Sequence, residues 1–166
     1  MAFDHGKTKV AIFWRKKRKG AQTKAKVRVG TKEVPFNQPA TRWLRVWLDS
    51  QLTQNEHYAT RLKNGRNAMR HLERLMGRMS LSPANCRSVM AVYIQSVAMF
   101  GAELWWKGDN AWGTTGRAEE LQLLVNQQAR AVTGAFQTTN LGVLSMESGL
   151  RPAANQLENR QRRFGL

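Results

Sequence analysis

The first part of the chain alternates hydrophobic and polar residues with a period of two. Segments 26–30 (KVRVG) and 31–36 (TKEVPF) alternate on either side of Gly30 and Thr31, which predicts a β-hairpin. Before it, the apolar run at 10–13 predicts a short strand that ends in the basic turn WRKKRKG. The sequence therefore predicts an antiparallel N-terminal sheet.

Segment 40–49, ATRWLRVWLD, is rich in aromatic and β-branched residues. Such a composition predicts one more strand, largely buried. Arg45 is the only cation in the middle of its apolar run, which a buried strand does not explain.

From residue 52 onward the hydrophobic period lengthens to that of an α-helix. One predicted helix has an apolar stripe formed by Leu62, Met69, Leu72, Met76 and Met79. On a different face of this helix, cations recur at spacings of three and four residues: Lys63, Arg66, Arg70, Arg74 and Arg78. This pattern predicts a helix with one buried face and one cationic face.

A second helix is predicted to begin with Ser82 as N-cap and Pro83 in its first turn. Its apolar residues fall on two sides, with Val89, Tyr93, Val97 and Phe100 on one and Met90 and Ile94 on the other. A helix that is apolar on both sides is expected in the core. Further helices are predicted at 118–135, at 141–148 ending at Gly149, and from Pro152 to the basic C-terminus. The predicted fold class is α+β, a small antiparallel sheet followed by a mostly helical bundle.

Charge narrows the range of partners. The chain has 27 Lys+Arg against 11 Asp+Glu, a formal net charge of +16. This balance predicts a polyanionic partner, either nucleic acid or an anionic membrane surface, with an inert basic surface as the alternative. The sequence shows no secretory signal, and its single cysteine suits a reducing compartment, so we expect an intracellular protein, cytoplasmic or nuclear. The apolar run at 88–106 is interrupted by polar residues and predicts a buried helix rather than a membrane span.

Catalytic side chains are sparse. Three scattered histidines, His5, His57 and His71, have no second ligand at metal-binding spacing, and Cys86 lacks the context of a nucleophile. The Gly-rich loop at 106–117 lacks the Lys-Ser/Thr pair of a phosphate-binding loop. We therefore expect no cofactor and no enzymatic activity of the isolated chain.

What remains is a binding surface, because cations are interleaved with tryptophans, a mixture that neutralises phosphates and stacks on bases. The alternative is that arginine stems merely cover the aromatic rings. We expect the cations to form one continuous face. The candidate nucleic-acid-binding residues are Arg15, Lys16, Lys17, Arg18, Lys19, Arg42, Trp43, Arg45, Lys63, Arg66, Arg70 and Arg74.

Four groups of residues together resemble one family. They are FDHGKTKVAIF (3–13), ATRWLRVWLD (40–49), LSPANC with AVYIQSVAMFGAELWW (81–86 and 91–106), and RAEELQLLVNQQARAVTGAFQTT with ESGLRPAANQLENRQRRF (117–139 and 147–164). In this order they resemble the reverse transcriptase of fungal LINE-type (non-LTR) retrotransposons, from the end of the palm through the thumb and connector. The resemblance covers nearly the whole chain.

The resemblance implies a role for each segment. Residues 1–50 would be the palm end and primer-grip β unit, 51–107 the thumb-like helices, and 108–166 a helical connector. Lys7 matches the family's lysine near the incoming nucleotide, and the primer-grip hairpin corresponds to 43–49. The helix with Arg66, Arg70 and Arg74 would follow the template–primer duplex.

The Tyr/Phe-x-Asp-Asp string of the family's catalytic centre is not found in this sequence. Two-metal nucleotidyl transfer needs carboxylates that converge on both ions. We therefore expect no polymerisation by this chain alone, with Mg²⁺ needed only by an intact parent enzyme that supplies the missing fingers and palm segment.

Arg45 departs from the family pattern, in which a glycine is usual at this position. Glycine permits a bulge or a close backbone approach to nucleic acid. The arginine is either an added phosphate contact or a change in an element that is no longer under selection. The sequence leaves both interpretations open.

The function hypothesis is a polymerase fragment that binds RNA, or RNA–DNA or DNA duplex, through its basic surface. The alternative is a truncated retroelement reading frame that acts as a protein-interaction module or has no function. Binding to anionic lipid through 15–19 is a weaker hypothesis, because no basic amphipathic helix flanks that run, and we expect no membrane partner.

Overall fold

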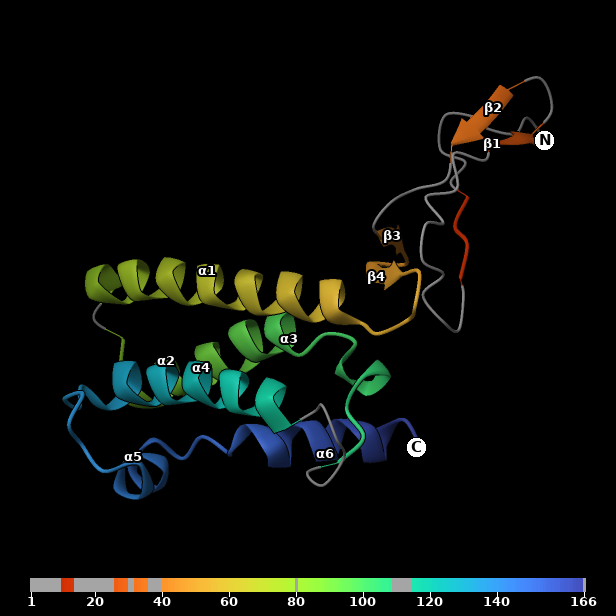
Figure 1. Ribbon diagram of the computed structural model, residues 1–166. Helices are drawn as coiled ribbons and strands as arrows, with labels where there is room; N and C mark the ends of the chain where they lie inside the picture. The colour runs from red at the N-terminus through yellow and green to blue at the C-terminus, as the bar shows by residue number, and fades with distance from the viewer. Residues whose placement is uncertain are drawn as a thin grey trace. The chain divides into compact units, whose positions relative to one another are not determined.

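The computed structural model describes residues 10–13, 26–29, 32–35, 40–79, 81–108 and 115–165. The chain divides into two compact units, 1–57 and 58–166. Short strands form the first unit and helices the second, so the predicted α+β fold class is confirmed (Figure 1). None of the helices in the described part of the chain combines the length and the apolar character that a membrane span requires.

The described strands of the first unit form two separate antiparallel ribbons. β1 (Lys26–Val29) pairs with β2 (Lys32–Pro35), which confirms the predicted hairpin. β3 (Ala40–Trp43) pairs with β4 (Val46–Asp49). The strand predicted at 10–13 is wrong for these residues, because only Val10 makes an isolated β-bridge. The basic turn that should follow it lies outside the described residues.

Segment 40–49 is a hairpin and not one strand, so that prediction is wrong. The chain reverses at Leu44 and Arg45, whose φ angles are +46° and +66°. Two consecutive left-handed residues form the two-residue turn whose twist matches that of paired strands. Arg45 is therefore an exposed turn residue at the tip of the ribbon. Its charge is solvated there, so the conflict between a cation and a buried strand does not arise.

Polar contacts organise the connection from β4 to α1 (Asn55–Met79). The Asp49 carboxylate accepts hydrogen bonds from the Thr53 hydroxyl and, at 3.4 Å, from the Gln54 amide. His57, in the first turn of α1, is fully buried, and its Nδ1 accepts a hydrogen bond from the Trp47 amide at 3.3 Å. This histidine thus supports β4.

The apolar stripe predicted for α1 is confirmed where side chains are described. Leu62, Met69 and Leu72 are buried. Between Leu62 and Met69, Gly65 allows a close approach of two helices, because a Cβ atom there would lie 2.7 Å from that of Ala98. The α1 helix therefore packs through this stripe against the following helix.

That following helix has three consecutive parts. They are α2 (Pro83–Val89), a π-helical segment η1 (Met90–Ile94) and α3 (Gln95–Ala98), after which Gly101, with φ +71°, turns the chain into the 3₁₀ turn η2 (Ala102–Leu104). The Ser82 side chain accepts a hydrogen bond from the Asn85 amide, and Pro83 lies in the first turn, so the predicted helix start is confirmed.

The prediction that both sides of this helix are buried is wrong. Met90 and Ile94 are fully buried, whereas Val92 is 73% and Tyr93 47% exposed, and Val89 and Phe100 are also exposed. Exposed apolar side chains are normal on a protein surface, so a second apolar face in the sequence pattern does not require burial.

The last three helices confirm the sequence predictions. They are α4 (Thr115–Thr133), α5 (Leu141–Ser148) and α6 (Ala153–Arg163). The predicted line of Leu121, Val125, Gln128 and Val132 on α4 is buried. Within this unit α4 lies between the α2–α3 helix and α6 (Figure 1). The core of the unit is formed where these helices meet α1.

Hydrogen bonds and a glycine set the ends of the two short helices. The Asn140 side chain accepts a hydrogen bond from the Gly142 amide at 2.8 Å and caps α5, which ends at Gly149 with φ +63°. The Ala153 amide at the start of α6 donates to Oε1 of Gln122 at 2.7 Å. Local capping and a hydrogen bond to α4 thus set the ends of the two C-terminal helices, which also pack into the core of the unit.

Candidate nucleic-acid interface

The cationic face of α1 is the largest predicted group that the structure brings together. Lys63, Arg66, Arg70 and Arg74 are all exposed. At 3.6 residues per turn they fall within about 80° of arc and span about 16 Å of helix axis. A duplex carries about ten phosphate charges over that length. The row is long enough to contact several phosphates at once.

Part of this face borders a groove between α1 and the C-terminal end of α4. The groove has a volume of about 540 Å³ and is lined by Arg66 and Arg70 from α1 and by Arg130 from α4. Glu73 also lines it, so the three guanidinium groups and one carboxylate leave a net charge of +2. The potential in the groove is positive in spite of the carboxylate.

Arg130 adds a fixed charge to this groove. Its Nη2 donates to the carbonyl oxygen of Gln137 at 3.4 Å, whereas its Nε is buried and has no hydrogen-bond partner among the described residues. Buried donors are rarely left without a partner. Because this nitrogen exposes almost no surface, a ligand in the groove would meet the charge of Arg130 and not this donor.

The β3–β4 hairpin carries three more of the predicted residues. Arg42 lies opposite Trp47, and Trp43 lies opposite Val46. Arg42 and Trp43 are adjacent in one strand, so their side chains project from opposite faces of the ribbon. Trp43 is 64% exposed, which leaves its ring accessible for stacking. One face of this ribbon cannot present both residues to the same ligand.

The other predicted residues lie outside the described part of the chain. These are Lys7 and the basic run Arg15, Lys16, Lys17, Arg18 and Lys19. The hairpin and the α1 face belong to different compact units. The expectation that all these cations form one continuous face therefore stays a prediction.

An aromatic cluster supports α1 beside its cationic face. The Tyr58 ring meets Trp105 edge to face at 5.3 Å, and the guanidinium of Arg117 lies 5.4 Å from the Tyr58 ring centre. The Tyr58 hydroxyl lies 3.0 Å from the Arg117 carbonyl oxygen and 3.1 Å from Oε2 of Glu120. Burial, followed by the charge and hydrogen bond of the Glu120 carboxylate, raises the pKa of Tyr58, and the positive charges of Arg66 and Arg117 oppose this effect. The tyrosine is thus a neutral structural group.

The described residues of the candidate interface offer cations and exposed aromatic surface. No group of three or more His, Cys, Asp or Glu residues that could hold a metal ion occurs within the described ranges. Cys86 is buried, and its thiol donates to the Leu81 carbonyl oxygen at 3.6 Å. The arrangement described here can bind an anion by charge and hydrogen bonding.

Sequence reasoning missed Arg130 and Gln137, which complete the groove with α1. Both follow the α1 cations by more than 50 residues, and no local pattern connects them with α1.

Comparison of the chain with protein-family models, with curated proteins and with solved structures finds no match.

Proposed function

We propose that this chain binds nucleic acid without sequence specificity, through the exposed cations of α1 and the groove beside it. The observation that carries the proposal is the single row of Lys63, Arg66, Arg70 and Arg74. Because phosphate charge does not depend on base identity, a row of this kind gives affinity without sequence preference.

The proposed ligand is an RNA–DNA or DNA duplex, and the proposed origin of the chain is the thumb-bearing part of a reverse transcriptase of the LINE type. Two features support this origin. A two-stranded hairpin occurs at 40–49, where the resemblance implies a primer grip. A long basic helix follows it, where the resemblance implies a thumb.

The experiment is a salt titration of binding to a fluorescently labelled RNA–DNA duplex, read by fluorescence anisotropy. Contact of four cations with phosphates predicts a slope of log K against log salt of about −3.6. The Arg70→Ala variant removes one contact and should reduce the magnitude of that slope by about 0.9. Two duplexes of unrelated sequence should bind with equal affinity.

Arg162→Ala is the matched control. Arg162 is an exposed arginine of the same unit whose guanidinium pairs with Glu158 at 2.9 Å, outside α1 and the groove. Its removal should leave the slope unchanged. A flat salt response, or equal slopes for Arg70→Ala and Arg162→Ala, would contradict the proposal.

A protein-interaction module is the second candidate, and exposed apolar residues on the α2–η1 helix favour it. Val89, Val92 and Tyr93 are 38%, 73% and 47% exposed at helical spacing. A protein partner held by this face should be retained after nuclease treatment and lost in Val92→Asp. Loss of the partner on nuclease treatment alone would assign it to bound nucleic acid.

A further inference from the structure

A second cationic pocket occurs in the helical unit, away from the residues of α1. It has a volume of about 390 Å³ and is lined by α2, by the connection between α5 and α6, and by α6. Its lining includes four arginines and no carboxylate: Arg87, Arg151, Arg160 and Arg163. None of these residues belongs to the predicted nucleic-acid surface, so the pocket is a separate feature.

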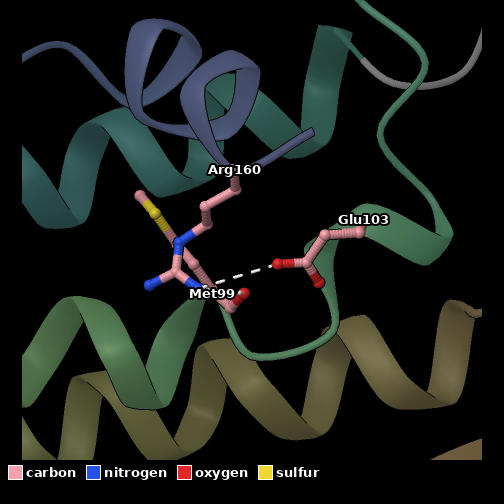
Figure 2. Close-up of polar contacts among 3 residues, drawn as sticks. All are labelled: Met99, Glu103 and Arg160. Carbon is pink, nitrogen blue, oxygen red and sulfur yellow. Dashed lines mark hydrogen bonds and ion pairs between the residues drawn. The ribbon is translucent and has the colours of Figure 1, made fainter. Parts of the chain in front are cut away.

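One of the four arginines is held in place by the protein. Nη1 of Arg160 lies 3.8 Å from Oε1 of Glu103 and donates to the carbonyl oxygen of Met99 at 3.5 Å, as Figure 2 shows. The Glu103 side chain is only 11% exposed. Arg160 is therefore a fixed wall of the pocket, and its charge is partly offset.

The other three arginines have no such partner. The guanidinium groups of Arg87, Arg151 and Arg163 make no hydrogen bond or ion pair with any described residue, and all three residues are exposed. Three like charges around one small pocket repel one another, and a bound anion would remove that repulsion.

Gly149 gives Arg87 its space. Its φ of +63° is a left-handed conformation that favours glycine, and a Cβ atom at this position would lie 2.8 Å from Nη1 of Arg87. Any larger residue would displace the guanidinium group. The C-cap of α5 thus allows an arginine from another helix to line the pocket.

From these contacts we propose that the pocket binds a phosphate group. Planar guanidinium groups match the paired oxygens of phosphate, and several of them around one anion favour its multiple negative charges over a single carboxylate. Pockets of about 300–1,000 Å³ are the usual size for small ligands. A free diphosphate and a phosphate of a nucleic acid offer the same chemistry.

The test uses inorganic pyrophosphate and the full chain, with heat of binding measured by isothermal titration. The unsubstituted protein should bind saturably, and Arg87→Gln and Arg163→Gln should each weaken binding about tenfold or more. The control is Arg162→Gln, since Arg162 is adjacent to Arg163 but does not line the pocket. No saturable binding, or equal losses in Arg162→Gln and Arg163→Gln, would overturn the proposal.

A glycine pair gives a second test that retains every arginine. Gly134 and Gly149 both have left-handed φ angles, +68° and +63°, but a Cβ atom at Gly134 meets nothing within 4 Å. Both alanine variants therefore introduce the same backbone strain, and only Gly149→Ala pushes on Arg87. Pyrophosphate affinity should fall in Gly149→Ala and stay unchanged in Gly134→Ala; equal affinities in the two variants would contradict the role of Arg87.

Competition separates the two sources of phosphate. A duplex without terminal phosphates that displaces pyrophosphate assigns the site to the nucleic-acid backbone, and a duplex that does not displace it assigns the site to a free diphosphate. Pyrophosphate binding to the pocket can be tested separately from duplex binding by α1, because Arg70→Ala should leave the pyrophosphate affinity unchanged. A loss in Arg70→Ala equal to that in Arg87→Gln would show non-specific attraction to the whole basic surface and overturn the pocket assignment.

Discussion

The two compact units of this protein are stabilised in different ways. Every buried apolar residue of the described chain belongs to the helical unit, from Tyr58 to Leu157, whereas the buried residues described in the first unit are Gln54 and His57. The helices share a core, and each β ribbon consists of two strands. Isolated two-stranded ribbons are marginally stable in water. Turn conformation and backbone hydrogen bonds therefore matter more than side-chain burial to the β3–β4 ribbon, none of whose residues is fully buried.

The largest expected effect comes from deleting core volume in the helical unit. Ile94→Ala removes buried methyl groups from a fully buried position in η1 and should lower the free energy of unfolding by about 2–5 kcal/mol. Val92→Ala in the same segment is the control, because Val92 is mostly exposed, and its change should stay within about 0.5 kcal/mol. Urea unfolding followed by far-UV circular dichroism measures both; equal losses would show that the two sides of η1 are buried alike.

An intermediate effect depends on pH. The raised pKa of Tyr58 means that, above its ordinary pKa of about 10, the unfolded chain loses the phenolic proton while the folded chain keeps it. The stability that this group contributes is complete below that pH and should then fall by up to about 1.4 kcal/mol per pH unit as the pH rises. Urea unfolding from pH 8 to pH 11 should show this decline, and Tyr58→Phe should lack it. The same decline in both proteins would assign it to other groups.

The smallest effect tests the ribbon. Arg45→Gly replaces a left-handed arginine and should stabilise the β3–β4 hairpin by about 1 kcal/mol, because an L-residue with a side chain is strained there. Slower hydrogen exchange of the Val46 and Trp47 amides would measure the gain. Urea unfolding of the helical unit should not change. If exchange becomes faster, the arginine contributes contacts that outweigh its backbone strain.

Helix boundaries were predictable because their signals are local. Ser82 with Pro83 marks the start of α2, and Gly149 marks the end of α5; both signals depend on a few consecutive residues. The cationic row of α1 was predictable for the same reason, since a helical repeat alone places its members on one face. Local rules thus account for most of the helical unit.

The hairpin at 40–49 was not predictable from its hydrophobic pattern, because its turn lacks the usual sequence signal. Two-residue turns of this kind normally contain Asn-Gly or a similar pair, and Leu44-Arg45 resembles neither. Alternation alone does not distinguish one long strand from two short ones. The left-handed conformation of Arg45 is one that favours glycine.

The groove and the arginine pocket were beyond sequence reasoning for a different reason. Arg87 and Arg163 line one pocket although 75 residues separate them, and each alone is an ordinary surface arginine. Only packing of α2 against the C-terminal segments brings them together. The same holds for Arg130, which reaches the α1 face from the last turn of α4.

The π-helical segment η1 has a consequence for tracing the ancestry of this chain. An i→i+5 turn accommodates one residue more than an α-helical turn, so a relative with a regular helix here would be one residue shorter between Ser88 and Gln95. An ungapped alignment would then pair the buried Ile94 with a neighbour of its true counterpart. Placing a single-residue gap within 90–94 would restore the match of core positions on both sides of the segment.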